Sequence, residues 1–277
     1  MGLKLMYITN RPDVAKIAEN AGVDRIFIDM EYIGKSERQG GMDTVQSHHT
    51  VEDIKRVKKA VHTSEIMVRV NPIHDATADY FSSKEEIDAV IKAGADVLML
   101  PYFKAVDEVN EFVELVNGRA KTLPLVETPE AVGIIDEILK IKGIDEIFVG
   151  LNDLSLGYGK KFMFELLTDG TVEKLCLKFK LAGVPYGFGG IAALGKGMLP
   201  AEYIIREHYR LGSTCVILSR SFCNVSKIND LDEINTTFLD GIRGIRNLEQ
   251  ECKKYSDYFK ENEQIVAEKV QMIRGNM

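Results

Sequence analysis

Residues 123–159 read LPLVETPEAVGIIDEILKIKGIDEIFVGLNDLSLGYG, and the predicted fold follows from this segment. The apolar run Leu123–Val126 predicts a strand that ends on Glu127. The β-branched run Ile144–Val149 predicts a second strand, which ends in the loop that carries Asp153. Between them, a proline suits a first helical turn, apolar residues recur at helical spacing, and a glycine ends the helix. A strand–helix–strand unit makes its two strands parallel neighbours, so both acidic residues are expected at the same edge of the sheet.

Outside this stretch the alternation of strand and helix continues. Strands are predicted at residues 4–9, 25–30, 66–70, 96–100, 185–188 and 214–218, and helices at residues 12–20, 51–61, 85–92, 106–116, 172–181 and 201–211. With the two strands above, this order predicts an α/β protein with a closed (β/α)8 TIM barrel. The alternative is an open, doubly wound sheet, but the G-x-G-x-x-G motif of dinucleotide-binding sheets does not follow the first strand.

The two acidic residues at the shared edge, Glu127 and Asp153, would repel each other unless a positive charge lay between them. Magnesium binds one or two protein carboxylates and leaves its other positions to water and substrate, so this pair is a candidate divalent-metal site. Alternatively, each residue caps a helix, since acidic residues are common at helix starts. The pair is a more specific signal than either member alone.

The segments VETPEAV, residues 126–132, and GLNDLSLGYG, residues 150–159, resemble the metal-binding motifs of the HpcH/HpaI aldolase family. This family comprises metal-dependent class II pyruvate aldolases and belongs with the phosphoenolpyruvate- and pyruvate-binding barrels, which include the citrate lyase β subunits. The similarity covers most of the chain. It implies a lyase in which Glu127 and Asp153 bind Mg²⁺ or Mn²⁺ and Asn152 contributes to substrate binding.

The second predicted strand is followed by Asp29, Glu31 and Tyr32, where the family pattern resembles D-x-E-H. Tyr32 thus replaces the family's acid–base histidine and leaves the proton transfer without its expected carrier. His48 and His49 lie later in the same long loop and are candidates for that role, as are Tyr32 itself and a metal-bound water. Alternatively, the two histidines are solvated residues ahead of a helix cap.

At the end of the third predicted strand, Arg69 in MVRVNP occupies the position of the family's active-site arginine. Its planar guanidinium can bind the carboxylate or the developing enolate oxygen of a pyruvyl group through charge-assisted hydrogen bonds. The alternative is a structural ion pair with Asp29 or Glu31, and the two roles are compatible.

Two loops that contain glycines or cations follow the last two predicted strands, GFGGIAALGKGMLP at residues 187–200 and SRSF at residues 219–222. In barrels of this type these loops often bind phosphate, because glycines let backbone N–H groups approach an anion. The candidate substrate-binding residues are Gly189, Gly190, Lys196 and Arg220. A substrate with a phosphate group or a second carboxylate is expected, and a flexible loop with turn glycines is the alternative.

The composition limits the classes of protein to which the chain can belong. The 277 residues, 45% of them hydrophobic, can bury one large core, and we predict a catalytic barrel domain at residues 1–225. A net charge of −7 argues against nucleic acid or an anionic membrane surface as a partner. We find neither an apolar run long enough to span a bilayer nor a signal peptide. The four cysteines have no metal or redox spacing, so we expect reduced thiols and a cytoplasmic location.

Residues 226–277 are predicted to form a charged helical extension. Their apolar stripe at helical spacing is longer than an eighth barrel helix needs. Surplus amphipathic helix commonly packs on a partner subunit, and the resemblance implies oligomers that exchange terminal helices, so we expect a homo-oligomer. The alternative is a helix folded back along its own barrel.

Together these features predict a divalent-metal-dependent carbon–carbon lyase, an aldolase that cleaves or forms a 2-oxo acid through a pyruvate enolate. The expected partners are a small 2-oxo acid and an aldehyde, with Mg²⁺ or Mn²⁺ as cofactor. One alternative is an acyl-CoA lyase or thioesterase like the citrate lyase β relatives, although their corresponding loop has a second acid where this chain has Tyr32. The other is a barrel that binds a keto acid without turnover, which the missing histidine favours.

Overall fold

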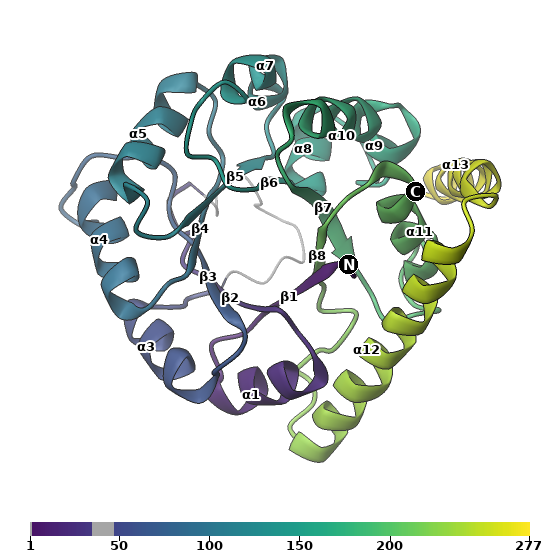
Figure 1. The fold of residues 1–277 in the computed structure, drawn as a ribbon, viewed down its shortest axis with the longest axis horizontal. Coiled ribbons are helices and arrows are strands. Elements are labelled where there is room, and N and C mark those ends of the chain that lie inside the picture. Colours follow the sequence, from purple (N-terminus) through teal and green to yellow (C-terminus); the bar gives the residue numbers. More distant parts are fainter. Residues whose placement is uncertain (1, 35–46) are drawn as a thin grey trace.

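The computed structural model describes residues 2–34 and 47–277, which form a closed parallel barrel surrounded by helices (Figure 1). Within these residues eight strands follow one another around the barrel in chain order, and the last strand pairs with the first. The predicted (β/α)8 TIM barrel is confirmed, and the open doubly wound alternative is wrong.

The strands are β1 (Lys4–Ile8), β2 (Arg25–Asp29), β3 (Glu65–Arg69), β4 (Val97–Leu100), β5 (Lys121–Val126), β6 (Ile147–Val149), β7 (Tyr186–Ile191) and β8 (Cys215–Leu218). The helices are α1 (Pro12–Ala21), α3 (Val51–Ala60), α4 (Ser83–Ala93), α5 (Val106–Val116), α6 (Pro129–Gly133), α7 (Ile135–Ile138), α8 (Leu151–Gly157), α9 (Glu165–Thr168), α10 (Thr171–Ala182), α11 (Ala201–Leu211), α12 (Leu231–Lys254) and α13 (Phe259–Gly275).

Side chains inside the barrel form an apolar cluster of their own. Its buried members are Met6, Phe27, Met67, Val97, Met99, Leu123, Leu125, Phe148 and Cys215. A second, larger cluster joins the strands to the surrounding helices. All four cysteines are free and buried. Because side chains fill the interior, binding and chemistry are left to the loops at the ends of the barrel.

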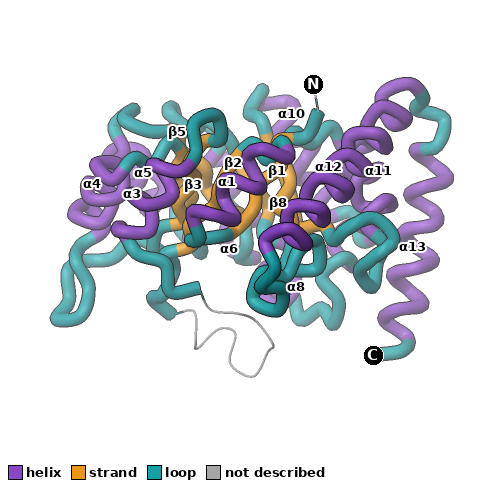
Figure 2. Tube along the Cα trace, turned by 90° about the horizontal axis from the view of Figure 1, so that it is seen from below, coloured by secondary structure: helices purple, strands orange, loops and turns teal. Residues whose placement is uncertain are grey.

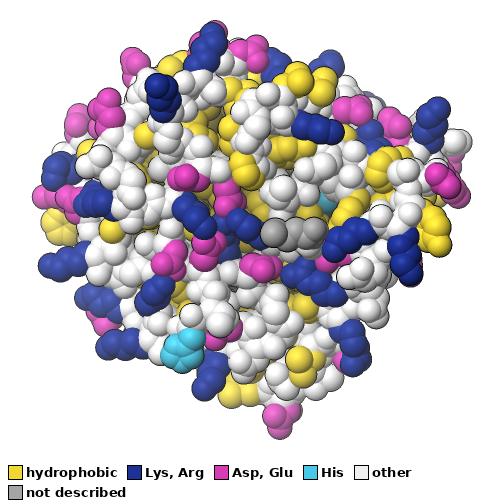
Figure 3. All heavy atoms as spheres, viewed as in Figure 1, with side chains coloured by type: hydrophobic (Ala, Val, Ile, Leu, Met, Phe, Trp, Pro, Cys, Tyr) yellow, Lys and Arg dark blue, Asp and Glu magenta, His cyan; other side chains and the backbone are white. Residues whose placement is uncertain are grey.

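Charged side chains close the pole where the strands begin. Arg25 is 0% exposed and donates to Glu146 from both terminal nitrogens, at 2.7 and 2.5 Å, and from Nε to Glu65 at 2.7 Å. Lys4 pairs with Glu146 at 3.0 Å, and Lys121 pairs with Glu65. Figure 3 views this pole and shows basic and acidic side chains gathered near the barrel axis. This network lies at the pole opposite the strand ends that carry the predicted site, so its role is structural.

Three local predictions in the central stretch were wrong. β6 is shorter than the predicted strand at residues 144–149. The single predicted helix between β5 and β6 is two short helices, because the backbone of Ile134 (φ −104°, ψ 12°) interrupts the helical run between α6 and α7. Asp153 lies in the first turn of α8 and not in a loop. Neither α8 nor α9 was predicted from the sequence.

The C-terminal extension folds along the outside of the same barrel (Figure 2). α12 packs against α1 and α11, and α13 packs against α11 and α9. The single chain therefore has the folded-back arrangement, and helix exchange within an oligomer stays a prediction. In the described ranges, no helix has both the length and the apolar character needed to cross a membrane.

Candidate active site

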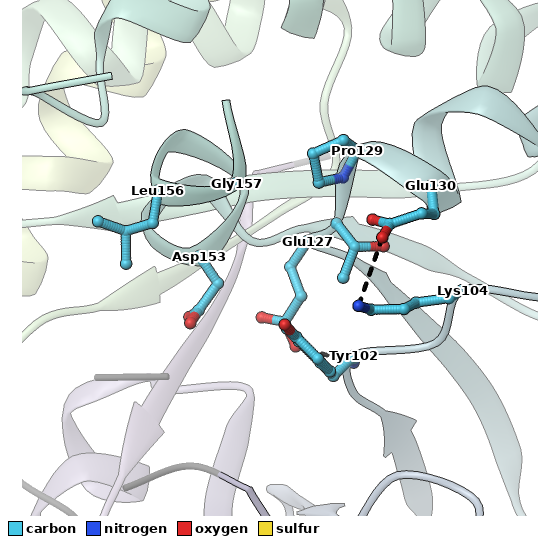
Figure 4. Close-up of a pocket in the computed structure, with 9 residues that line it drawn as sticks. Tyr102, Lys104, Glu127, Pro129, Glu130, Asp153, Leu156 and Gly157 are labelled. Atoms are coloured by element: carbon cyan, nitrogen blue, oxygen red, sulfur yellow. Dashed lines mark hydrogen bonds and ion pairs between the residues drawn. The ribbon is translucent and has the colours of Figure 1, made fainter. Parts of the chain in front are cut away.

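Glu127 and Asp153 line one cavity at the pole where the strands end. Glu127 directly follows β5, and Asp153 lies in the first turn of α8, shortly after β6. Figure 4 shows the two side chains side by side, with both carboxylates directed to the same side of the cavity. The cavity has a volume of about 450 Å³, and its lining residues are Tyr102, Lys104, Glu127, Thr128, Pro129, Glu130, Asp153, Leu156 and Gly157. The structure thus brings together the two acidic residues that the sequence pairs.

Two glycines let the elements that carry these carboxylates pack closely. A Cβ on Gly150 would lie 2.8 Å from both Cβ and Oε2 of Glu127. A Cβ on Gly157 would lie 2.6 Å from Cδ of Pro129, at the start of α6. Both separations are shorter than ordinary non-bonded contacts, so this packing of α8 against the end of β5 and the start of α6 requires glycine at both positions.

Glu127 is a buried carboxylate in an unfavourable charge environment. It is 3% exposed, and its Oε1 accepts a hydrogen bond of 2.9 Å from the backbone N–H of Tyr102. Tyr102 donates from a left-handed backbone conformation (φ 51°), which is uncommon outside glycine and recurs at functional sites. Burial, followed by repulsion from Glu31 and Asp153, raises the pKa of Glu127 well above its usual range, although Arg69 opposes this shift.

Arg69 is held above the inner apolar cluster by two acidic side chains. Its Nε and Nη2 donate to the two carboxylate oxygens of Asp29, each at 2.9 Å, and its Nη1 lies 3.3 Å from Oε2 of Glu31. The guanidinium carbon lies 5.6 Å from the ring centre of Phe27. Burial disfavours the charged form, but Asp29 and Glu31 outweigh it and raise the pKa of Arg69 above its ordinary value. The ion pairs considered from the sequence are present, and the arginine is oriented and charged.

The donor set of the cavity fits a hard divalent cation. A cation beside Glu127 would relieve the repulsion that raises its pKa. Two carboxylates, with the other positions left to water and substrate, are typical protein ligands of Mg²⁺. Within the described ranges, no group of three or more His, Cys, Asp or Glu side chains is arranged to hold a metal. The fit is therefore to a two-carboxylate site that is completed by water or substrate.

The structure distinguishes the candidates for proton transfer. His49 is buried, and its Nδ1 accepts a hydrogen bond of 3.0 Å from the backbone N–H of Asp29, which is a structural contact. His48 is exposed, and its ring stacks beside Tyr32 at a centroid distance of 6.0 Å. Burial, followed by Asp29, raises the pKa of Tyr32 to about 12, so the phenol stays protonated at neutral pH. None of these three rings is among the residues that line the carboxylate cavity.

The remaining predicted substrate-binding residues are not among those that line the carboxylate cavity. Lys196 and Arg220 line a second cavity. Gly189 and Gly190 belong to β7 and are not among the lining residues of either cavity, and the half-buried Asn152 on α8 is likewise absent from both linings. Lys196 and Arg220 thus share one cavity, and substrate binding by the five predicted residues stays a prediction.

Two residues of the carboxylate cavity, Tyr102 and Lys104, were not predicted as site residues from the sequence. Lys104 pairs with Glu130 at 3.3 Å, and its Nζ lies 5.0 Å from the ring centre of Tyr102. Both residues follow β4, and side chains after barrel strands are the usual site residues of this fold. Their position directly after the fourth strand is the sequence signal that indicates them as site residues.

Comparisons with known proteins identify similar sequences. The family model described as HpcH/HpaI aldolase/citrate lyase matches residues 4–165, which is more than half of the chain. A hydroxypyruvate/pyruvate aldolase from Sagittula stellata is 22% identical over 178 residues, which cover 53% of this chain. The match spans 61% of that relative's own length.

Solved structures share the fold. An HpcH/HpaI aldolase/citrate lyase family protein from Burkholderia cenocepacia J2315 aligns with a TM-score of 0.62 at 18% identity, over 84% of this chain and 95% of that one. An HpcH/HpaI aldolase from Desulfitobacterium hafniense DCB-2 aligns with a TM-score of 0.59 at 18% identity, over 88% of this chain and 93% of that one. At these identities the likeness establishes the barrel and not the chemistry.

Proposed function

The chain belongs to the HpcH/HpaI aldolase/citrate lyase family, and we propose that it is a divalent-metal-dependent carbon–carbon lyase that cleaves or forms a 2-oxo acid. The observation that carries this proposal is the placement of Glu127 and Asp153 in one cavity, close enough to Arg69 for the arginine to affect the pKa of Glu127. The hydroxypyruvate/pyruvate aldolase among its relatives supports a pyruvate-type substrate.

Glu127 and Asp153 would hold Mg²⁺ or Mn²⁺, which supplies Lewis-acid polarisation of a keto oxygen. The hydrogen bond from Tyr102 and the burial of Glu127 fix one carboxylate before substrate arrives. The close approach of Gly150 to Glu127 keeps the second carboxylate, on α8, near the first. The chain's own packing therefore sets the spacing of the two ligands.

Arg69 would stabilise the negative charge that develops on the enolate of the 2-oxo acid. Asp29 and Glu31 occupy only part of the five N–H donors of its guanidinium, so donors on Nη1 and Nη2 remain for substrate. Hydrogen bonds from a charged, fixed guanidinium strengthen as the oxygen becomes negative, which lowers the barrier to breaking the carbon–carbon bond.

Aldol cleavage also removes a hydroxyl proton from the substrate and returns a proton to the enolate carbon. With a pKa of about 12, Tyr32 can donate a proton at neutral pH but cannot serve as the base. His48 lies beside Tyr32 and is exposed to water, so the two rings form a candidate route for a proton between the site and solvent. We propose that Tyr32 and His48, although they do not line the carboxylate cavity, carry the proton between the site and solvent, and that His49 has a structural role.

The test is exchange of the methyl protons of pyruvate in D₂O, followed by proton NMR. Wild-type protein with Mg²⁺ should catalyse exchange, and EDTA should stop it. Glu127→Gln should slow exchange at least about a hundredfold. Glu130→Gln should keep it within about twofold, because Glu130 lines the same cavity but is exposed and paired with Lys104. No exchange by a wild-type protein that binds oxalate would contradict the lyase and identify a keto-acid-binding barrel.

A further inference from the structure

A single side chain holds the backbone from which Tyr32 projects. Oδ1 of Asn71 accepts a hydrogen bond from the N–H of Tyr32 at 2.8 Å and another from the N–H of Ile33 at 3.0 Å. Asn71 is 6% exposed, so these hydrogen bonds lie largely out of water, where they are stronger. The residue follows β3 and thus joins the segment after β3 to the segment after β2. Both segments carry residues of the candidate site.

The backbone N–H groups of the two preceding residues also have acceptors. That of Met30 donates to the carbonyl of Arg69 at 3.0 Å, which continues the pairing of β2 with β3. That of Glu31 donates to Oδ1 of Asp29 at 3.3 Å. Each N–H of residues 30–33 therefore has a fixed acceptor, and the last two share one side-chain oxygen.

Asn71 is itself held by Glu86 on α4. Its backbone N–H donates to the two carboxylate oxygens of Glu86 at 3.2 and 3.3 Å, and its Nδ2 donates to Oε1 at 3.0 Å. An asparagine amide has one acceptor oxygen and two N–H donors, so the contact with Glu86 fixes which end of the amide faces Tyr32. Without it, rotation of the amide by half a turn would set its N–H donors against the backbone N–H groups.

The loop that joins Asn71 to α4 is braced by His74. The backbone N–H of His74 donates to the hydroxyl of the buried Ser83 at 2.9 Å. Its two ring nitrogens each lie 2.7 Å from a carbonyl oxygen, one of Pro72 and the other of Phe81. The anchor of Asn71 on α4 is therefore part of a closed, hydrogen-bonded unit.

We propose that Asn71 is a positioning residue that fixes the orientation of the Tyr32 side chain, with Glu86 as its anchor. The inference rests on the proton transfer proposed above for Tyr32. The ring of Tyr32 stacks beside that of His48 at a centroid distance of 6.0 Å, so a shift of the backbone at Tyr32 would disturb both rings of the route. A small displacement of a reacting group lowers a rate steeply, so loss of Asn71 should affect turnover as well as stability.

The first test follows the ring of Tyr32 by fluorine NMR of protein labelled with 3-fluorotyrosine. The Tyr32 resonance is the one missing from the Tyr32→Phe protein. Asn71→Ala should shift it, because the acceptor of two backbone N–H groups is lost. Asn71→Asp keeps that acceptor but sets a second carboxylate against Glu86, so it should shift the resonance too. Asn71→Asp combined with Glu86→Gln should restore the wild-type resonance, because the introduced amide can donate to the introduced carboxylate.

The second test is exchange of the methyl protons of pyruvate with Mg²⁺ present. Asn71→Ala should slow exchange about tenfold or more in the wild-type background but less than about twofold in Tyr32→Phe, because its effect passes through the phenol. Asn71→Asp combined with Glu86→Gln should regain the wild-type rate within about threefold. Asn247→Ala replaces an exposed asparagine on α12 and is the control, which should change neither the rate nor the Tyr32 resonance.

An unchanged Tyr32 resonance in Asn71→Ala would overturn the proposal. Equal slowing by Asn71→Ala in the wild-type and Tyr32→Phe backgrounds would overturn it as well, because the effect would then not pass through Tyr32. Circular dichroism checks that each variant is folded. If wild type shows no exchange, the lyase proposal fails, and the fluorine resonance alone decides whether Asn71 positions Tyr32.

Discussion

Gly150 lies so close to Glu127 that a Cβ on the glycine would be 2.8 Å from both Cβ and Oε2 of the carboxylate side chain. The glycine directly precedes α8, and the glutamate directly follows β5. This contact sets how close the helix that carries Asp153 comes to Glu127. The geometry of the two carboxylates therefore depends on a residue with no side chain.

Gly150→Ala should displace Glu127 and slow metal-dependent pyruvate exchange about tenfold or more, since a small shift of a ligand is costly. Overpacking should also lower the free energy of unfolding by about 1–3 kcal/mol. Gly133→Ala on α6 is the control, because a Cβ there meets no atom within 4 Å and the backbone suits alanine. Denaturant unfolding and NMR exchange rates measure both. If the Gly150→Ala and Gly133→Ala proteins have the same exchange rate and the same free energy of unfolding, the close contact at Gly150 does not position Glu127.

Variants of Tyr32, His48 and His49 should differ in their effects on pyruvate exchange and on stability. Tyr32→Phe and His48→Ala should each slow pyruvate exchange about a hundredfold, the usual size of a general acid–base effect. His49→Ala should mainly lower stability, because it leaves the backbone N–H of Asp29 without its 3.0 Å hydrogen bond to Nδ1.

The pH–rate profile tests the part played by Tyr32. Tyr32, with a pKa of about 12, should contribute no change below pH 10. Wild-type rates and an unchanged profile in both the Tyr32→Phe and His48→Ala proteins would contradict the assignment.

Glu86 on α4 should make stability depend on pH. Its carboxylate accepts from the backbone N–H and side-chain amide of Asn71, whose Oδ1 in turn accepts from the backbone N–H groups of Tyr32 and Ile33. Burial raises the pKa of Glu86 from 4.5 to about 7. Between these values the unfolded chain has lost its proton while the folded protein keeps it, so stability should fall as pH rises from about 4.5 to about 7.

Glu86→Gln should remove this decline while its carbonyl still accepts from Asn71. Urea unfolding at several pH values measures the slope for wild type, Glu86→Gln and the exposed control Glu111→Gln. If stability falls with pH in the Glu86→Gln protein as it does in wild type, other titrating groups cause the pH dependence.

The charged network at the strand-start pole should be worth far more than a surface pair. Arg25→Ala leaves Glu146, which is 4% exposed, with Lys4 alone and should cost about 3–5 kcal/mol of stability. Lys58→Ala breaks the exposed 2.6 Å pair with Asp96 and should cost less than about 1 kcal/mol. Chemical denaturation measures the free energy of unfolding of both variants. A similarly small loss of stability in both would show that the Arg25 network contributes no more than a surface pair.

The barrel and the position of Glu127, Asp153 and Arg69 at one pole could be predicted because strand ends can be recognised from the local sequence. Short apolar runs stop at Asp29, Arg69 and Glu127, and closure of a parallel barrel places all such ends at one pole. The strand order then follows from the chain order. Asp153 was paired with Glu127 for the same reason, even though the helix that carries it was missed.

The remainder depends on contacts between distant parts of the chain. The backbone N–H of Tyr102 donates to a carboxylate 25 residues away, and His49 accepts from a backbone group 20 residues away. A backbone donor has no sequence pattern, so neither contact could be read from local periodicity. Similarly, Gly189 and Lys196 lie in one glycine-rich stretch, yet folding puts one on β7 and the other in the second cavity.

We propose that Glu127 and Asp153 together bind a divalent cation. The most direct test of this metal site is a calorimetric titration with Mg²⁺ of wild type, Glu127→Gln, Asp153→Asn and the exposed control Glu130→Gln. We expect one Mg²⁺ per chain in wild type and in Glu130→Gln, and at least about tenfold weaker binding in the other two variants. Equal Mg²⁺ affinity in the wild-type and Glu127→Gln proteins would contradict the claim.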